Sequence, residues 1–440
     1  MTYEWQDFGF HIPQIMLPKE GTDYSKWAVV ACDQFTSQPE YWNETETIVG
    51  DAPSTLRLML PEYYLGSDDE EERIAGIRQN MDQYMTDGTL RTLEPGCILV
   101  RREAEGRSRL GLVISVDLEA YDYTKGSQSL IRATEGTVIE RIPPRLRIRR
   151  GAPLEMPHIM ILIDDPDRTV IEPLEQLSLT CVYDTDLMQD GGHVTGHFIP
   201  EADLGGMKEA LSKLMDQAVA RYGEGHVIFQ AMGDGNHSLA TAKAAWEEIK
   251  KDLSPEEAAH HPARYALCEI ENVHDEGIVF EPIHRVVFAA DNLKGQDLMD
   301  QLVTILAEQN GAASFVPDGA DPEDKIASDD GFAVTAMYEG AEGSLVIDGP
   351  CTSKLAVGTL QNAIDVLVRD FGASVDYIHG EEAVRQLAGK DGNLGFLLPA
   401  MDKFQLFPAV AADGALPRKT FSMGEANEKR YYIESRSLKA

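Results

Sequence analysis

Hydrophobic positions recur along the chain at two spacings, one typical of helices and one typical of buried strands. Residues 202–222 and 236–250 carry apolar side chains at helical intervals, which predicts two amphipathic helices. The apolar runs at 158–164 and 226–232 predict buried strands. Because the second run leads directly into the second helix, this part of the chain has the order strand, turn, helix.

The rest of the chain shows the same mixture of patterns. Periodicity predicts further helices at 68–87, 294–309 and 352–371, and further strands at 26–32, 97–102, 109–118, 332–338, 344–348, 394–399 and 430–436. We therefore expect an α+β fold with mixed α/β sheets. The length favours two domains, which we place at residues 1–290 and 291–440.

One segment, residues 132–150, is rich in arginine. Its basic residues are Arg132, Arg141, Arg145, Arg147, Arg149 and Arg150. The adjacent prolines Pro143 and Pro144 predict extended chain or loop here, since proline removes a backbone donor and clashes with a preceding helical turn. The segment is compatible with an anion-binding site, and also with an exposed strand that pairs with acidic neighbours.

Charge excludes several classes of partner. The 440 residues carry a formal net charge of −35. Such a surface repels nucleic acids and anionic membranes, so we expect neither as a partner. The apolar runs are too short for a membrane helix, and the N-terminal residues show no signal-peptide pattern. With five scattered cysteines, which are typical of reduced thiols, we expect a cytoplasmic protein.

The turn between the predicted strand and helix carries candidate chemistry. It reads Gly233, Asp234, Gly235, Asn236, His237 and Ser238. A helix N-terminus presents backbone N–H groups and a partial positive charge, and glycine lets a ligand approach the backbone closely. The turn is compatible with a phosphate site, but it matches neither common nucleotide-binding consensus. A plain strand-to-helix turn would have the same pattern.

The block VIFQAMGDGNHSLATAKAAW, residues 227–246, resembles the box A-D-G-H-H-R-Y-x-T-A of the bacterial domain-of-unknown-function 1015 family (DUF1015). The matching positions are Asp234, Gly235, His237, Thr241 and Ala242. The blocks at 133–145, 281–285 and 416–432 are also similar to the family. DUF1015 in turn resembles the ParB and sulfiredoxin superfamily, which implies a nucleotide-binding core with a large insertion and a smaller C-terminal α/β domain.

Two positions of the box differ from the family pattern. Asn236 stands at the first His, and Ser238 stands at the Arg. Without the arginine the turn lacks a planar, bidentate phosphate donor. Sulfiredoxins have a cysteine at the position of Asn236, so we do not expect sulfinic-acid reduction.

The resemblance implies roles for individual residues. The phosphates of ATP or ADP would lie against Gly233, Asp234, Gly235, Asn236, His237, Ser238 and Thr241. Substrate-binding candidates are Arg132, Arg141, Arg145, His284, Arg285 and Lys419. Asp234 or Glu135 would hold Mg²⁺, and Asp33 or Glu135 would accept the substrate proton. Asp234 and His237 complete the candidate catalytic set.

Three functions follow from this set. The first is a nucleotide-dependent phosphotransferase that acts on a small hydroxyl-bearing metabolite, since some superfamily relatives phosphorylate free serine. The second is hydrolysis of a nucleotide or phosphate ester at the same site. The third is a nucleotide-sensing binding protein without turnover, which the departures at Asn236 and Ser238 favour.

Overall fold

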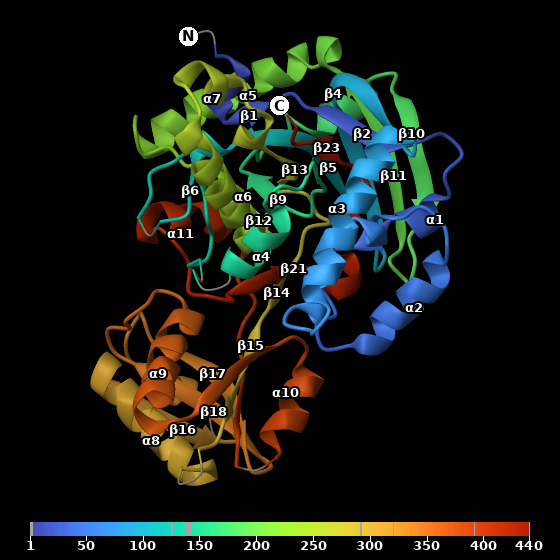
Figure 1. Ribbon diagram of the computed structural model, residues 1–440. Coiled ribbons are helices and arrows are strands. Elements are labelled where there is room, and N and C mark those ends of the chain that lie inside the picture. Colours follow the sequence, from blue (N-terminus) through green and yellow to red (C-terminus); the bar gives the residue numbers. More distant parts are fainter. Residues whose placement is uncertain are drawn as a thin grey trace. The chain divides into compact units, whose positions relative to one another are not determined.

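The computed structural model describes residues 3–124, 126–137, 139, 142–290, 293–319, 321–390 and 392–439 (Figure 1). It divides into two compact units. Unit 1 consists of Met1–Val279, Lys403–Ala415 and Met423–Ala440, and unit 2 of Phe280–Asp402 and Leu416–Ser422. The last segment of the chain therefore belongs to the same unit as the first. The domains 1–290 and 291–440 stay a prediction, which differs from these units mainly in where it assigns that segment.

Among the described residues, unit 1 is built on an 11-stranded mixed sheet with the order β10-β11-β4-β5-β13-β9-β12-β7-β6, in which β1 also pairs with β5 and β2 with β4. These strands are β1 (Phe10–His11), β2 (Gln14–Pro18), β4 (Leu90–Ala104), β5 (Arg107–Asp117), β6 (Tyr121–Asp122), β7 (Ile131–Arg132), β9 (Met160–Ile163), β10 (Thr180–Asp186), β11 (His193–Pro200), β12 (Gln230–Asp234) and β13 (Tyr265–Asn272). Its helices are α1 (Tyr24–Trp27), α2 (Pro39–Val49), α3 (Glu70–Thr86), α4 (Ile142–Arg149), α5 (Gly205–Tyr222), α6 (Asn236–Ile249), α7 (Pro255–His260) and α11 (Leu406–Asp413).

The sheet of unit 1 buries apolar side chains on both faces, because successive residues of a strand point to opposite sides. Ile114 of β5 packs in a core that includes Leu211 of α5 and Trp246 of α6. Its neighbour Val113 packs in a second core that includes Met81 of α3. Helices α5 and α6 thus cover one face, and α3 covers the other.

Short strand pairs tie the two ends of the chain into unit 1. Strand β22 (Tyr431–Tyr432) pairs with β3 (Val29–Val30), and β23 (Arg436–Ser437) pairs with β8 (Leu154–Glu155). Residues near the C-terminus therefore lie beside segments about 280 to 400 positions earlier in the chain.

Unit 2 contains, within its described part, a six-stranded antiparallel sheet with the order β16-β18-β17-β20-β15-β19. Its strands and helices are β15 (His284–Phe288), α8 (Gly295–Asn310), β16 (Ala312–Pro317), β17 (Phe332–Tyr338), β18 (Ala341–Asp348), α9 (Ala356–Phe371), β19 (Ser374–Ile378), α10 (Glu381–Ala388) and β20 (Leu394–Leu397). Strands β14 (Phe280–Pro282) and β21 (Phe421–Met423) form a separate pair. Leu302 of α8 and Leu360 of α9 share one core, while Val384 of α10 packs with Val286 in another.

The α+β fold class is confirmed, but several predicted elements are wrong in detail. The largest error is at residues 142–149, which form helix α4 rather than extended chain. Pro143 and Pro144 fall in the first turn of this helix, where backbone N–H groups have no intrahelical acceptor, so proline costs little there. Arg147 pairs with Glu70 and Glu71 of α3, and Arg149 pairs with Glu155.

Three strand predictions also differ from the structure. The run at 26–32 contains the end of α1 and the two-residue strand β3, and the strand predicted at 226–232 runs instead from Gln230 to Asp234. The run at 430–436 is divided between β22 and β23. No helix in the described parts of the chain combines the length and the apolar character that crossing a membrane requires.

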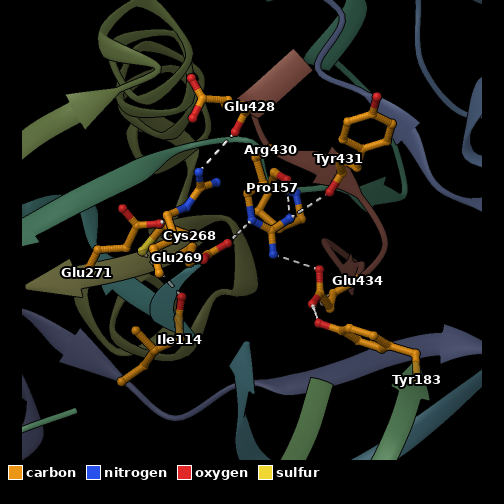
Figure 2. Close-up of polar contacts among 11 residues, drawn as sticks. Ile114, Pro157, Tyr183, Cys268, Glu269, Glu271, Glu428, Arg430, Tyr431 and Glu434 are labelled. Atoms are coloured by element: carbon orange, nitrogen blue, oxygen red, sulfur yellow. Dashed lines mark hydrogen bonds and ion pairs between the residues drawn. The ribbon is translucent and has the colours of Figure 1, made fainter. Parts of the chain in front are cut away.

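A buried ionic cluster holds the C-terminal segment inside unit 1 (Figure 2). Its centre is Arg430, whose side chain is 4% exposed. The guanidinium donates to Glu269 at 2.6 Å, to Glu434 at 2.7 Å and to the carbonyl of Pro157 at 2.8 Å. The hydroxyl of Tyr183 donates to the other oxygen of Glu434. Because both carboxylates are buried, the charge of Arg430 offsets the cost of removing them from water.

A third buried carboxyl, Glu271, lies two residues beyond Glu269 on β13 and pairs with Arg109 at 2.9 Å. Burial raises the pKa of Glu271 to about 8, since the attraction of Arg109 does not offset the loss of hydration and the negative charge of Glu269. Glu269 Oε1 and Glu271 Oε2 have no hydrogen-bond partner among the described residues. A proton on Glu271 would remove the repulsion between the two carboxylates. It would also supply a hydrogen-bond donor where both of these oxygens lack one.

Replacing Arg430 with methionine should destabilise unit 1 strongly. Arg430→Met leaves Glu269 and Glu434 buried without their cation, which should cost about 3–5 kcal/mol. The control is Arg57→Met, since Arg57 and Glu46 form a partly exposed pair at 2.7 Å whose loss should cost less than about 1 kcal/mol. Urea unfolding of the two variants measures both costs. Equal losses would show that the Arg430 cluster does not stabilise the fold.

The raised pKa of Glu271 predicts a pH dependence of stability. The folded protein holds the proton up to about pH 8, whereas the unfolded chain releases it near its ordinary value of 4.5. The contribution of Glu271 is therefore fully present below pH 4.5 and is lost as the pH rises to about 8. In Glu271→Gln this loss should be absent, so the unfolding free energy of the variant should rise relative to wild type between pH 5 and pH 8. Parallel pH profiles from urea unfolding would contradict the assignment.

Candidate functional site

The candidate site begins at the turn between β12 and α6. Gly235 has a φ of +81°, in the left-handed region, and α6 starts at the next residue. A Cβ on Gly235 would lie 3.1 Å from the Cα of Ile159, and a Cβ on Gly233 would lie 2.3 Å from Sδ of Met423. Both glycines therefore have a geometric role: Gly235 lets the backbone turn into the helix, and Gly233 permits close packing.

The start of α6 is held by side chains as well as by the backbone. The backbone N–H groups of Ser238 and Leu239 both donate to the carbonyl of Gly235. The side chain of Asn236 accepts from the backbone N–H of Thr134 at 3.2 Å and donates to its hydroxyl at 3.4 Å. Glu135 follows Thr134 directly, so this contact places the candidate base or metal ligand Glu135 beside the helix N-terminus.

Asp234 forms an ion pair at this turn with a lysine, and its own side chain is half-buried. Its Oδ2 lies 2.9 Å from Nζ of Lys429, and its Oδ1 accepts the backbone N–H of Gly235 at 2.8 Å. Burial by itself favours the protonated acid, but the ammonium group of Lys429 outweighs it and lowers the pKa of Asp234. Asp234 is therefore an ionised anchor for a lysine. Its role as a Mg²⁺ ligand stays a prediction.

The imidazole of His158 contacts one residue of α6, one near the N-terminus and one near the C-terminus. Its Nε2 lies 2.8 Å from Oγ of Ser238, and its Nδ1 lies 2.7 Å from the hydroxyl of Tyr432. The carboxylate of Asp33, a predicted catalytic base, lies 3.9 Å from Nε2. Ser238, Asp33 and Tyr432 thus meet at one imidazole, although they are up to about 400 positions apart in the sequence.

A cavity of about 150 Å³ opens beside this imidazole. Its polar lining includes Glu62, Arg145, His158, Ser238, Thr241 and Tyr432. Its apolar lining includes Leu58, Met59, Met81, Ile148, Met156 and Ile159. The lining includes two predicted nucleotide-binding residues, Ser238 and Thr241, and one predicted substrate-binding arginine, Arg145. All of it belongs to unit 1.

Arg145 forms an ion pair with Glu62 in the wall of the cavity. Burial raises the pKa of Glu62, the charge of Arg145 opposes this effect, and the neighbouring Asp33 adds to it. A carboxylate with a raised pKa binds a proton more readily than an exposed one. Glu62 is therefore suited to accept a proton from a hydroxyl group.

Other predicted site residues lie elsewhere. Arg132 is buried on β7, where its guanidinium donates to the carbonyls of Ser129 and His226 and to the side chain of Gln128. These contacts are typical of a structural arginine. Arg141 lies outside the described residues.

The three candidates from the second half of the chain belong to unit 2. Nδ1 of His284 accepts the backbone N–H of Leu398, and burial lowers the pKa of His284. Arg285 is fully buried and donates to Gln361. Lys419 has a φ of +56°. Their role in substrate binding stays a prediction.

Four residues around the start of α6 and the cavity were not among the site residues predicted from the sequence. They are Glu62, His158, Lys429 and Tyr432. Lys429 and Tyr432 belong to the 416–432 block, so the resemblance to the family was a signal for them. His158 starts an apolar run, and Glu62 is one of many acidic residues. No local pattern distinguishes those two.

Comparisons with known proteins identify the family. Residues 16–366 match the family described as "Protein of unknown function (DUF1015)". The chain therefore belongs to the DUF1015 family. No curated protein matches the sequence.

Among solved structures the likenesses are weak. A free serine kinase in complex with AMP is 10% identical with a TM-score of 0.40, over 74% of this chain and 92% of that chain. A conserved hypothetical protein from Pyrococcus furiosus is 12% identical with a TM-score of 0.36, over 74% and 95%. C-terminally truncated SbnI from Staphylococcus aureus is 10% identical with a TM-score of 0.35, over 73% and 82%. At this level, similarity says nothing of activity or site.

Alanine at position 235 tests the geometry of the turn. Gly235→Ala forces a left-handed φ on a residue with a Cβ, which should cost about 1–2 kcal/mol of unfolding free energy. The matched control is Gly136→Ala, because Gly136 has no left-handed φ and its Cβ would meet open space. That change should be neutral or stabilising by about 0.4–1 kcal/mol. If chemical unfolding shows equal effects, the turn does not have the described conformation.

Proposed function

We propose that this DUF1015 protein is a nucleotide-dependent phosphotransferase that transfers a phosphoryl group to a small hydroxyl-bearing metabolite. The phosphates of ATP or ADP would lie at the N-terminus of α6, in a ParB/sulfiredoxin-like core. The observation that carries the proposal is the meeting of cationic and carboxylate side chains from distant segments at this one helix end. They include Arg145 and Lys429 as cations and Asp33 and Glu62 as acids.

The helix end supplies what a phosphate group needs. Backbone N–H groups of the first turn and the positive end of the helix dipole attract an oxyanion. Ser238 and Thr241 line the adjoining cavity, and His237 lies in the same turn. Lys429 and Arg145 would offset the charge that develops on the transferred group.

The carboxylates supply the remaining chemistry. Asp33 or Glu62 would accept the proton of the acceptor hydroxyl, and the raised pKa of Glu62 suits that role. Glu135, which lies beside the helix end, or Asp234 would hold a Mg²⁺ ion that bridges the phosphates. Each of these carboxylates comes from a different segment, and all belong to unit 1.

A nucleotide-sensing protein without turnover is the second candidate. Ser238 favours it, because a serine in place of the box arginine cannot give two parallel hydrogen bonds to a phosphate. Hydrolysis at the same site would differ from transfer in that product formation would not depend on an added alcohol.

A thermal-shift experiment tests nucleotide binding directly. Wild type, His237→Ala and the exposed-site control His260→Ala are heated with ATP, ADP, GTP or CTP, with and without Mg²⁺. A nucleotide at about 100 times its Kd should stabilise wild type by roughly 2.7 kcal/mol. We expect the shift to vanish in His237→Ala and to persist in His260→Ala, since His260 is exposed at the end of α7.

Two other outcomes would change the proposal. If no nucleotide shifts the wild type, the phosphotransferase and sensor hypotheses both fail. If a shift occurs without turnover across a panel of alcohol acceptors, the sensing function replaces the transferase.

A further inference from the structure

The contact between Ser238 and His158 has the geometry of a nucleophile and its base. Oγ of Ser238 and Nε2 of His158 are 2.8 Å apart, and both residues line the cavity. Ser238 lies in the first turn of α6, where the helix dipole stabilises negative charge. A serine hydroxyl is a weak nucleophile unless an adjacent base can take its proton.

Hydrogen bonds behind the imidazole orient it for this task. The hydroxyl of Tyr432 donates to Sγ of Cys32 at 3.2 Å, so its oxygen remains to accept a proton from Nδ1 of His158 at 2.7 Å. Burial raises the pKa of both Tyr432 and Cys32, which keeps these groups neutral. With the proton on Nδ1, Nε2 of His158 has the free electron pair that accepts the hydroxyl proton of Ser238.

A carboxylate is placed to stabilise the charged product of that proton transfer. Asp33 Oδ2 lies 3.9 Å from Nε2 of His158, on the side that would gain the proton. The arrangement therefore contains a nucleophile, a base of defined tautomer and a counter-charge. A serine with only a structural role would not need a base and a counter-charge beside its hydroxyl.

We propose that Ser238 carries the phosphoryl group as a phosphoserine intermediate, with His158 as general base and Tyr432 as the residue that positions it. This inference rests on the proposed function and specifies how the transfer proceeds. Oγ of Ser238 bonds to the terminal phosphorus of a nucleoside triphosphate, and its proton passes to Nε2 of His158. The bond between that phosphorus and the bridging oxygen breaks, and the nucleoside diphosphate leaves with the electron pair.

The second half-reaction restores the enzyme. The acceptor hydroxyl oxygen bonds to phosphorus, and its proton passes to a carboxylate, Glu62 or Asp33, and then to solvent. The bond from phosphorus to Ser238 breaks, and Oγ recovers the proton from His158. A phosphoserine in the first turn of a helix is stabilised by the helix dipole, so the intermediate should accumulate when no acceptor is present.

The test needs no knowledge of the acceptor. Full-length protein is incubated with γ-labelled ATP and Mg²⁺, quenched in acid and mapped by mass spectrometry. In parallel, exchange of labelled ADP into ATP is measured, which requires a reversible phosphoenzyme. Phosphoserine survives both acid and hydroxylamine, whereas phosphohistidine is lost in acid and acyl phosphates are cleaved by hydroxylamine. Treating the quenched protein with hydroxylamine therefore distinguishes a label on Ser238 from one on His158 or Asp33.

The variants separate chemistry from folding. Ser238→Ala should abolish both label and exchange, whereas Ser212→Ala should behave as wild type, since Ser212 bonds only to the Lys208 carbonyl of its own helix α5 among the described contacts. His158→Gln should slow labelling roughly hundredfold or more. Tyr432→Phe should slow labelling and change its pH profile, which a merely structural role would not do. Thermal melting of each variant verifies that it is folded.

Failure of the phosphoserine intermediate and failure of the proposed function give different results. If ATP shifts the melting temperature but wild type shows neither label nor exchange, the phosphoserine is overturned. Turnover with the panel of alcohol acceptors then decides between direct transfer and nucleotide sensing. If no nucleotide binds, the proposed function fails, and acetyl phosphate replaces ATP as donor. Label on Ser238 from acetyl phosphate would then support the nucleophile, and its absence would overturn it.

Discussion

The candidate site depends on the buried guanidinium of Arg430. Its ion pairs with Glu269 and Glu434 hold the end of the chain inside unit 1. The residues on either side, Lys429 and Tyr432, are thereby brought to Asp234 and His158. A buried ionic cluster is a weak source of net stability, because the desolvation of each charge offsets most of the attraction. The cluster nevertheless fixes the position of the C-terminal segment, because displacing one partner would leave a buried charge without its counter-charge.

A second constraint acts on the backbone. The left-handed Gly235 lets α6 start directly after β12, and the side chain of Asn236 ties this start to Thr134. The helix N-terminus is therefore fixed from one side by the turn and from the other by the arginine-anchored segment. The polar end of the cavity lies between them, where Ser238 contacts His158. Binding and catalysis both require such preorganisation, since groups that move must be ordered again by the ligand.

Prediction from sequence succeeded where neighbouring residues decide the structure. Helix α6 starts at the predicted residue, because the glycine turn and the apolar periodicity both act within a few positions. The same local reasoning failed for α4. Pro143 and Pro144 are unfavourable inside a helix, but they are tolerated in its first turn. Local rules do not state where a helix begins when the residues before it carry no capping signal.

The sequence by itself determined the fold class, the strand–turn–helix unit and, through its resemblance to DUF1015, the turn as a candidate phosphate site. These depend on periodicity, glycine geometry and a contiguous motif. Only the tertiary structure decided that His158, Glu62 and Lys429 join that turn, and that Arg132 is buried in contacts of its own. The reason is physical: these contacts are made between side chains far apart in the chain, and pairing among buried charges depends on the whole folded arrangement.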